Sequence, residues 1–397
     1  MNDAGLLLGI GLLMLASIAV DALGRKTFLP RVSLLILLGI AAGPEFLDLL
    51  PVRLIEHSHL VTNISLAMVA FLLGGELSFE RLRRLGRAIV SVSLLVVVAT
   101  AAFVGGGLAL LGAPPVLAVM LAGIATATDP AAAQDVVHES GSRSNFSRTI
   151  LGVVAIDDGW GVILFGVLLG ASSLLNGGSG GHGGDAVLHA LREVGGAAAA
   201  GSLIGLCAAA LTGRLRAGEP TLSEALGIVF LCAGAALWLE VSFLLTPMVA
   251  GLVIANLARH HRRTFRAIEH IEWPFLVLFF VLAGARLELA HVLRGGVLLA
   301  AYMALRIGGR ICGGWIGGRL GGLAPGQSRA IGLALMPQAG VALGLALAAG
   351  DAFPELASML LTITISSTIF FEVAGPVMTR HILTSQQRRL PAGRKDP

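Results

Sequence analysis

Charged residues are scarce in this chain: Asp, Glu, Lys and Arg make up 13% of its 397 residues, against about 25% in an average soluble domain. Hydrophobic residues make up 55%. So few charges cannot cover a core of this size with a polar surface. We therefore interpret the chain as a membrane protein that crosses the bilayer many times, and the usual relation between length and number of soluble domains does not apply.

Cysteine is also scarce. Cys207, Cys232 and Cys312 all lie in apolar runs without CxxC spacing, which argues against a disulfide framework or a zinc site and favours small core residues. No basic segment alternates with aromatics, so the net charge of +4 does not indicate nucleic-acid binding. The N-terminus lacks a basic segment and an A-x-A site, so its apolar run is interpreted as a spanning helix rather than a signal peptide.

Long apolar runs are abundant, and they predict an all-helical fold with about thirteen transmembrane helices. A helix needs about 20 apolar residues to cross a bilayer. The runs lie at roughly 5–23, 32–50, 60–79, 88–111, 115–136, 149–175, 186–213, 221–239, 243–258, 272–288, 293–318, 328–350 and 355–382. The many glycines are expected where transmembrane helices approach closely.

The distribution of basic residues supports this count and gives an orientation. If the N-terminus is outside, all but six of the 28 Lys and Arg residues fall on the cytoplasmic side. The exceptions are Arg53, Arg192 and Arg294 outside, and Arg286, Arg306 and Arg310 within spans. Such a bias follows the positive-inside rule, and one missed or added helix would invert the rest of the pattern. We expect the N-terminus outside and the C-terminus in the cytoplasm.

The most informative polar residues are Asp157 and Asp158, which are adjacent and are the only acidic residues in the apolar run 149–175. A charge at the bilayer centre costs roughly 2.5–3.5 kcal/mol on insertion scales, so the pair indicates an internal site for cations or protons. Because neighbouring helix residues point about 100° apart, we expect one carboxylate to coordinate an ion and the other to pair elsewhere.

Two of the predicted spans are interrupted by proline. Pro130 lies inside the fifth span, and Pro337 lies inside the twelfth, followed by Gln338 and Gly340. Proline removes a backbone hydrogen bond, and the freed groups must be satisfied by protein, water or an ion. Either proline alone would indicate a kink. Because the two spans run in opposite directions, the pair predicts an inverted repeat whose broken helices cross near the midplane.

Thr128 and Asp129 place a hydroxyl and a carboxylate at the first interruption. Asp129 could cap the following half-helix or contribute to an ion site, and the two roles are compatible. With Asp157 and Asp158 these are hard oxygen ligands, which suit Na⁺ or K⁺ rather than soft metals. A proton and a cation would compete for the same oxygens, which yields exchange when the empty carrier does not reorient. We expect no cofactor besides the transported ions.

Arg306 and Arg310 lie four residues apart on the eleventh span. Basic residues at this depth are expected to face the interior and pair with carboxylates, although both could reach the cytoplasmic surface instead. An arginine stays charged, so it can neutralise an aspartate but cannot release a proton. Glu372, deep in the thirteenth span, is either a supporting acid or a packing partner, and Gln338 is a further candidate for support.

Five ordered segments carry a family resemblance. They are TDP (128–130), IDDGWG (156–161), FFVLAGARLEL (279–289), the segment around Arg306, and PQAGVALGLA (337–346). Their order and spacing resemble the monovalent cation:proton antiporter superfamily over nearly the whole chain. The adjacent aspartates are similar to its second branch, which is NapA-like and Kef-like.

The resemblance implies thirteen helices with the N-terminus outside, which the charge distribution indicates independently. It also implies a dimerisation domain, a mobile core with the crossed fifth and twelfth helices, and elevator-like alternating access. By motif position, Asp158 would be the main ion-binding carboxylate, and Thr128 and Asp129 would fill the crossing. Asp157 would pair with the basic residue of the eleventh helix, with Arg306 as the first choice and Arg310 left open.

The sequence departs from the family pattern at two positions. Arginine stands where electrogenic members have lysine, which argues against a two-proton stoichiometry. Val341 stands where an acidic residue often follows the glycine of the twelfth helix.

We expect a single exchanger domain over residues 1–397. Its core would be roughly 60–175 and 293–382, its dimerisation part roughly 1–50 and 186–288, and a short basic cytoplasmic tail would cover 383–397. The protein would be a homodimer in a bacterial inner membrane.

The leading hypothesis for function is Na⁺/H⁺ antiport, and K⁺/H⁺ antiport or Kef-like potassium efflux is the alternative within transport. A cation channel would more often line its pore with repeated rings. An intramembrane aspartyl protease would need aspartates on separate helices, whereas these are adjacent and no GxGD occurs. We therefore expect a transporter and not an enzyme.

Overall fold

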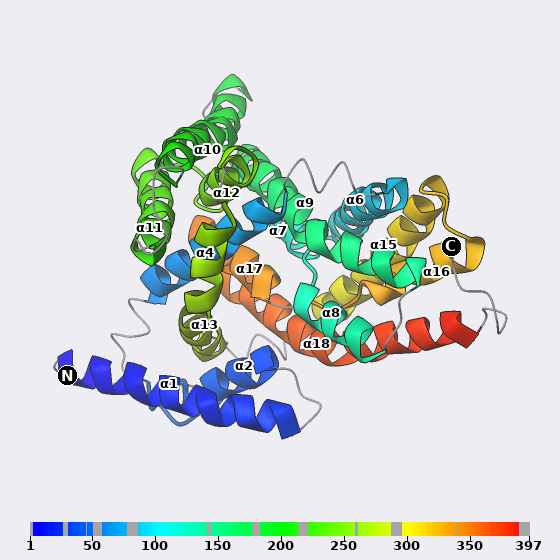
Figure 1. Ribbon diagram of the computed structural model, residues 1–397, viewed down its shortest axis with the longest axis horizontal. Coiled ribbons are helices and arrows are strands. Elements are labelled where there is room, and N and C mark those ends of the chain that lie inside the picture. The colour runs from blue at the N-terminus through cyan, green and yellow to red at the C-terminus, as the bar shows by residue number, and fades with distance from the viewer. Residues whose placement is uncertain are drawn as a thin grey trace. The chain divides into compact units, whose positions relative to one another are not determined.

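A computed structural model describes residues 3–26, 31–44, 46–50, 58–77, 86–140, 144–176, 183–212, 221–258, 261–286, 296–338 and 340–388 (Figure 1). Within these ranges every regular element is a helix. The chain forms two compact units. The first unit comprises residues 1–81 and 162–289, and the second comprises 82–161 and 290–397.

Eight helices of the described ranges are long and apolar enough to cross a membrane, judged by length and composition. Five shorter apolar helices accompany them. The all-helical membrane fold is therefore confirmed. The number of thirteen crossings stays a prediction, because the shorter helices fall below the length that a full crossing requires.

Helices α1, α2, α4, α10, α11, α12 and α13 belong to the first unit. Their bounds are Asp3–Lys26, Arg31–Ala42, Ser58–Glu76, Gly183–Thr212, Thr221–Leu239, Leu245–Leu257 and His261–Ala285. Helices α2 and α13 pack at glycines: a Cβ on Gly39 would meet the Val281 carbonyl, and one on Gly284 would meet that of Ile36. Small residues at such contacts let membrane helices approach closely.

The second unit holds α6, α7, α8, α15, α16, α17, a 3₁₀ turn η1 and α18. Their bounds are Arg87–Leu110, Pro115–Ile124, Pro130–Glu139, Gly296–Leu320, Pro325–Ala334, Gly340–Ala352, Pro354–Leu356 and Ala357–Arg388. Helix α9, Asn145–Asn176, passes from the second unit to the first after Gly161.

Helix α15 packs along α6 (Figure 1). A stripe of glycines at every fourth position of α15 makes this contact. A Cβ on Gly309, Gly313 or Gly317 would lie 2.6–2.7 Å from Thr100, Val96 or Val92 Cα. No side chain fits at these distances, so the stripe brings the two backbones together. The close contact fixes the rotation of α15 about its own axis, and therefore the direction in which Arg306 and Arg310 point.

Both predicted interruptions occur as breaks between short helices. Helix α7 ends at Ile124 and α8 begins at Pro130, where a residue without an N–H is well tolerated. Helix α16 ends at Ala334, and α17 begins at Gly340. Pro337 lies between them against α18, where a Cβ on Gly375 would stand 2.6 Å from Pro337 Cα.

Several boundaries differ from the sequence-based expectation. Helix α13 begins at His261, well before residue 272, because the basic amphipathic segment preceding the apolar run is also helical. Helix α18 continues to Arg388 and so includes the first residues of the expected tail. Helix α4 and the second half of α9 group with the first unit, whereas the sequence placed them with the core. The roles of core and dimerisation part stay predictions.

The α6–α15 contact can be tested by adding a side chain to it. Gly313→Leu should lower the thermal midpoint of the purified protein, because overpacking a tight contact typically costs about 1–3 kcal/mol. The control is Gly106→Ala on α6, where a Cβ meets nothing within 4 Å. An unchanged midpoint for the leucine variant would contradict the packing.

Candidate functional site

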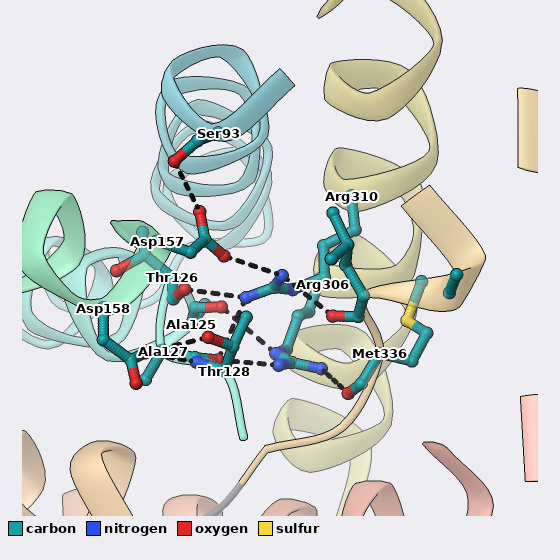
Figure 2. A network of polar contacts seen from close by, with 12 residues as sticks. Ser93, Ala125, Thr126, Ala127, Thr128, Asp157, Asp158, Arg306, Arg310 and Met336 are labelled. Atoms are coloured by element: carbon teal, nitrogen blue, oxygen red, sulfur yellow. Dashed lines mark hydrogen bonds and ion pairs between the residues drawn. The ribbon is translucent and has the colours of Figure 1, made fainter. Parts of the chain in front are cut away.

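The candidate site lies within the second unit, where α9, α15 and the two interruptions meet. Its four central side chains are buried: Asp157, Arg306 and Arg310 are 0% exposed and Asp158 is 1% exposed. Figure 2 shows that these side chains and the backbone of both interruptions form one polar network. Neither arginine reaches the surface, so the alternative in which both extend to the cytoplasmic side is wrong.

Arg306 joins the two interruptions through backbone carbonyls (Figure 2). Its Nε donates to Ala125 O at 3.1 Å and its Nη2 to Ala127 O at 2.9 Å, both in the first interruption. Its Nη1 donates to Met336 O at 3.1 Å in the second. The guanidinium also lies 4.3 Å from the ring centroid of Phe371 on α18, a cation–π distance.

Arg310 makes a parallel connection one turn further along α15. Its Nη2 donates to Thr126 O at 2.7 Å and to Ala127 O at 2.9 Å. Its Nη1 donates to Leu335 O at 2.9 Å in the second interruption. One guanidinium therefore reaches both interruptions, and the two breaks lie against each other as an inverted repeat requires.

These carbonyls follow the C-terminal ends of α7 and α16. Helix ends leave carbonyls without intrahelical partners and carry a partial negative charge. At the end of α16, Ala334 O accepts a hydrogen bond of 3.0 Å from the Thr379 hydroxyl instead. The arginines thus satisfy the exposed carbonyls and neutralise both negative helix ends in a region without bulk water.

Asp157 is held by α15 and α6. Its Oδ2 lies 3.4 Å from Arg310 Nη1, and its Oδ1 accepts a hydrogen bond of 3.5 Å from Ser93. The resemblance implied that Asp157 pairs with Arg306, and this is wrong. Arg306 and Arg310 differ by one turn on the same face, and it is the later one that reaches the carboxylate.

Asp158 points to the first interruption, away from the arginines (Figure 2). Its Oδ1 accepts hydrogen bonds from the backbone N–H of Thr128 at 2.8 Å and from its hydroxyl at 3.0 Å. Its Oδ2 is buried and has no hydrogen-bond partner in the described part of the chain. The two aspartates therefore point in different directions, as expected. Asp157 pairs with Arg310, and Asp158 has one carboxylate oxygen without a hydrogen-bond partner among the described residues.

Asp129 caps α8, since its Oδ1 accepts a hydrogen bond of 3.1 Å from the N–H of Ala132.

Gln338 is fully buried beside Pro337, and its amide makes no hydrogen bond to the described residues. Glu372 is 2% exposed on α18, between the residues that contact Arg306 and Pro337. Asp129, Thr128, Pro130 and Gly340 thus lie at the interruptions, with Gln338 and Glu372 beside the second.

Sequence reasoning missed three contributors to the network: Ser93, Phe371 and Thr379. Each is an ordinary residue of an apolar span, and only the packing of α6 and α18 brings them to the site. The one available signal was the position of Phe371 directly before a buried acid.

Two interrupted helices that meet beside a buried carboxylate are typical of secondary transporters, whose half-helix ends and side chains bind the transported ion. The fold and the site therefore define a multi-pass transporter of this class. A family model described as "Sodium/hydrogen exchanger, transmembrane" matches residues 10–384. The chain belongs to this family and is a cation/proton antiporter, which confirms the resemblance to the superfamily.

One curated relative and one solved structure are similar to the chain. The chain is 24% identical over 335 residues to the "Ammonium/H(+) antiporter subunit AmhT" of Alkalihalophilus pseudofirmus, covering 83% of each chain. Its fold is similar to the sodium proton antiporter MjNhaP1 from Methanocaldococcus jannaschii, solved at pH 8. That match has a TM-score of 0.75 at 18% identity, and it covers 97% of this chain and 99% of the other.

The structural role of Arg306 can be tested by truncation. Arg306→Ala should lower the thermal midpoint strongly, because the buried carbonyls of Ala125 and Met336 lose this donor, and each buried group left unsatisfied typically costs about 1–3 kcal/mol. The matched control is Arg319→Ala on the same helix, where the side chain is exposed. Equal midpoints for the two variants would show that the carbonyl contacts contribute little to stability.

Proposed function

We propose that the chain exchanges Na⁺ for protons by alternating access, with Asp158 as the carboxylate that binds the two ions in turn. The observation that carries this proposal is the buried Oδ2 of Asp158, which has no hydrogen-bond partner among the described residues. A buried carboxylate oxygen is costly unless a proton or a cation neutralises it. Such an oxygen is therefore suited to hold either ion, but not both together.

Asp157 is less suited to this role. Its carboxylate faces Arg310 at 3.4 Å, and arginine does not release its proton. A cation at Asp157 would lie beside a permanent positive charge. We therefore assign Asp157 to holding Arg310, and we assign the Thr128 hydroxyl, 3.0 Å from Asp158, to ordering the ion-binding carboxylate.

Na⁺ is the first candidate among cations because carboxylate and hydroxyl oxygens are hard ligands that suit small hard ions, and because the family is that of sodium/hydrogen exchangers. The ammonium/proton antiporter subunit among the relatives makes ammonium the second candidate. K⁺ is the third. All three can be compared in the same vesicle assay.

We propose further that the protein lies in a bacterial plasma membrane as a homodimer, with its N-terminus outside and its C-terminus in the cytoplasm. The positive-inside bias of the sequence supports the orientation, and the family resemblance supports the dimer. The proposal needs no cofactor and no enzymatic step, because the transported ions are the only substrates.

The assignment of Asp158 is tested with Asp158→Asn in proteoliposomes, where a fluorescent dye reports the collapse of a proton gradient on addition of Na⁺, Li⁺, K⁺ or ammonium. The variant should lose exchange with every cation, because an amide neither ionises nor releases a proton. The control is Asp135→Asn on α8, whose side chain is exposed, and it should exchange normally. Retained exchange by a folded Asp158→Asn protein would refute the assignment.

The charge balance of the site also predicts stoichiometry. Asp157 stays paired with Arg310, so Asp158 alone changes its bound ion, and we expect one cation to exchange for one proton. Exchange should then be independent of membrane potential. This is checked by measuring the rate of Na⁺/H⁺ exchange in proteoliposomes whose membrane potential is set to several values with K⁺ gradients and valinomycin. A rate that rises with potential would show that a second proton moves.

A further inference from the structure

The two half-helices that begin at the interruptions are capped differently. Helix α8 has Asp129 before its first residue, and that carboxylate accepts the N–H of Ala132. Helix α17 has no acidic residue in its first turn. Gln338, two residues before its start, makes no hydrogen bond from its amide within the described residues. The partial positive charge at the N-terminus of α17 therefore lacks a local counter-charge.

Helix α18 passes antiparallel along α17, the second interruption and α16. Near the start of α18, Ala357 packs against Gly350 of α17. A Cβ added to Gly350 would lie 3.1 Å from Ala357 Cβ. Further along, Gly375 meets Pro337, and the Thr379 hydroxyl donates to Ala334 O at 3.0 Å. Near the end of α18, Gln386 Nε2 donates to Gly326 O on α16 at 3.4 Å.

These contacts place Glu372 about one helical turn from the level of Pro337, beside the segment from which α17 begins at Gly340. Glu372 lies three residues before Gly375 and seven before Thr379, so the three share the face of α18 that covers the second interruption. Its neighbour Phe371 contacts the Arg306 guanidinium, and Glu372 itself is 2% exposed. A buried acid thus lies at the helix end that carries no acid of its own.

The other buried charges of the described site contact groups away from the start of α17. Arg306 and Arg310 serve the negative ends of α7 and α16, and Asp129 serves α8. Among the described side chains with buried charges, Asp157 faces Arg310 and Asp158 faces Thr128. Glu372 is buried on the face of α18 that covers the second interruption.

We propose that Glu372 is a positioning residue whose carboxylate neutralises the N-terminus of α17, as Asp129 does for α8, and so sets the electrostatic field in which Asp158 binds its cation. It does not touch the transported ion. Removing its charge leaves an excess of positive charge beside the site, which weakens cation binding at Asp158. The transport readout of this inference rests on the proposed exchange function.

The test moves the charge rather than only removing it. Glu372→Gln keeps size and shape but not charge, and Val341→Glu places an acid in the first turn of α17. In the full-length protein, Glu372→Gln should lower the thermal midpoint and raise KM for Na⁺ about fivefold, which corresponds to about 1 kcal/mol, with little change in the maximal rate. The double variant Val341→Glu/Glu372→Gln should restore both quantities. Glu355→Gln, exposed in η1, is the matched control and should change neither.

The outcomes separate the possible roles. A structural role based on packing alone predicts no effect of the isosteric Glu372→Gln, or an effect that Val341→Glu does not repair, and either result overturns the proposal. If Glu372→Gln does not fold, recovery of folding in the double variant supports the charge role, and failure of both the double variant and Glu372→Asp overturns it. If the wild type exchanges no cation, the proposed function fails, while the thermal midpoints still decide the role of Glu372.

Discussion

The arrangement of this site depends on two arginines that bind backbone carbonyls. Interrupting a transmembrane helix exposes carbonyls in a region where water cannot satisfy them, and each would cost several kcal/mol. Arg306 and Arg310 satisfy carbonyls from both interruptions with bonds of 2.7–3.1 Å. The bonds to carbonyls are shorter than the 3.4 Å between Arg310 and Asp157. The guanidinium groups are therefore first of all the link between the two broken helices, and the ion pair is secondary.

This link separates the paired charges of the site from Asp158, the carboxylate proposed to exchange ions. The positive charges are committed to helix ends, and Asp157 is committed to Arg310. Asp158 lies on the next position of the same helix but turns toward Thr128. Adjacent positions on one helix thus serve two purposes because they point in different directions. The Oδ2 of Asp158 is a buried carboxylate oxygen of the described site without a hydrogen-bond partner, and the proposed exchange at a single carboxylate rests on it.

The sequence predicted the residues of the site better than their contacts. Acids in an apolar run and prolines within two spans are visible because they are expensive in a membrane, so the aspartates and the interruptions could be located without coordinates. The sequence could not decide whether Arg306 or Arg310 pairs with Asp157, since residues four apart share a helix face and differ only in depth. Ser93 and Phe371 could not be found either. A serine or phenylalanine in an apolar helix has little free-energy cost in a membrane, so nothing in the sequence distinguishes it. The register of α18, which places Glu372, depends on tertiary packing alone.

The geometry also explains why arginine suits both positions on α15. Each guanidinium presents planar donors that reach carbonyls on two different segments at once, and it stays charged at any physiological pH. A lysine has three donors on a single nitrogen, so it could not span the two interruptions with the same set of bonds, and it can lose its proton when buried. A proton lost at that position would leave helix ends unneutralised and would add a second titrating group to the cycle. The same contacts that hold the two broken helices together therefore also support the proposal that transport chemistry occurs at Asp158, the aspartate that the arginines do not touch.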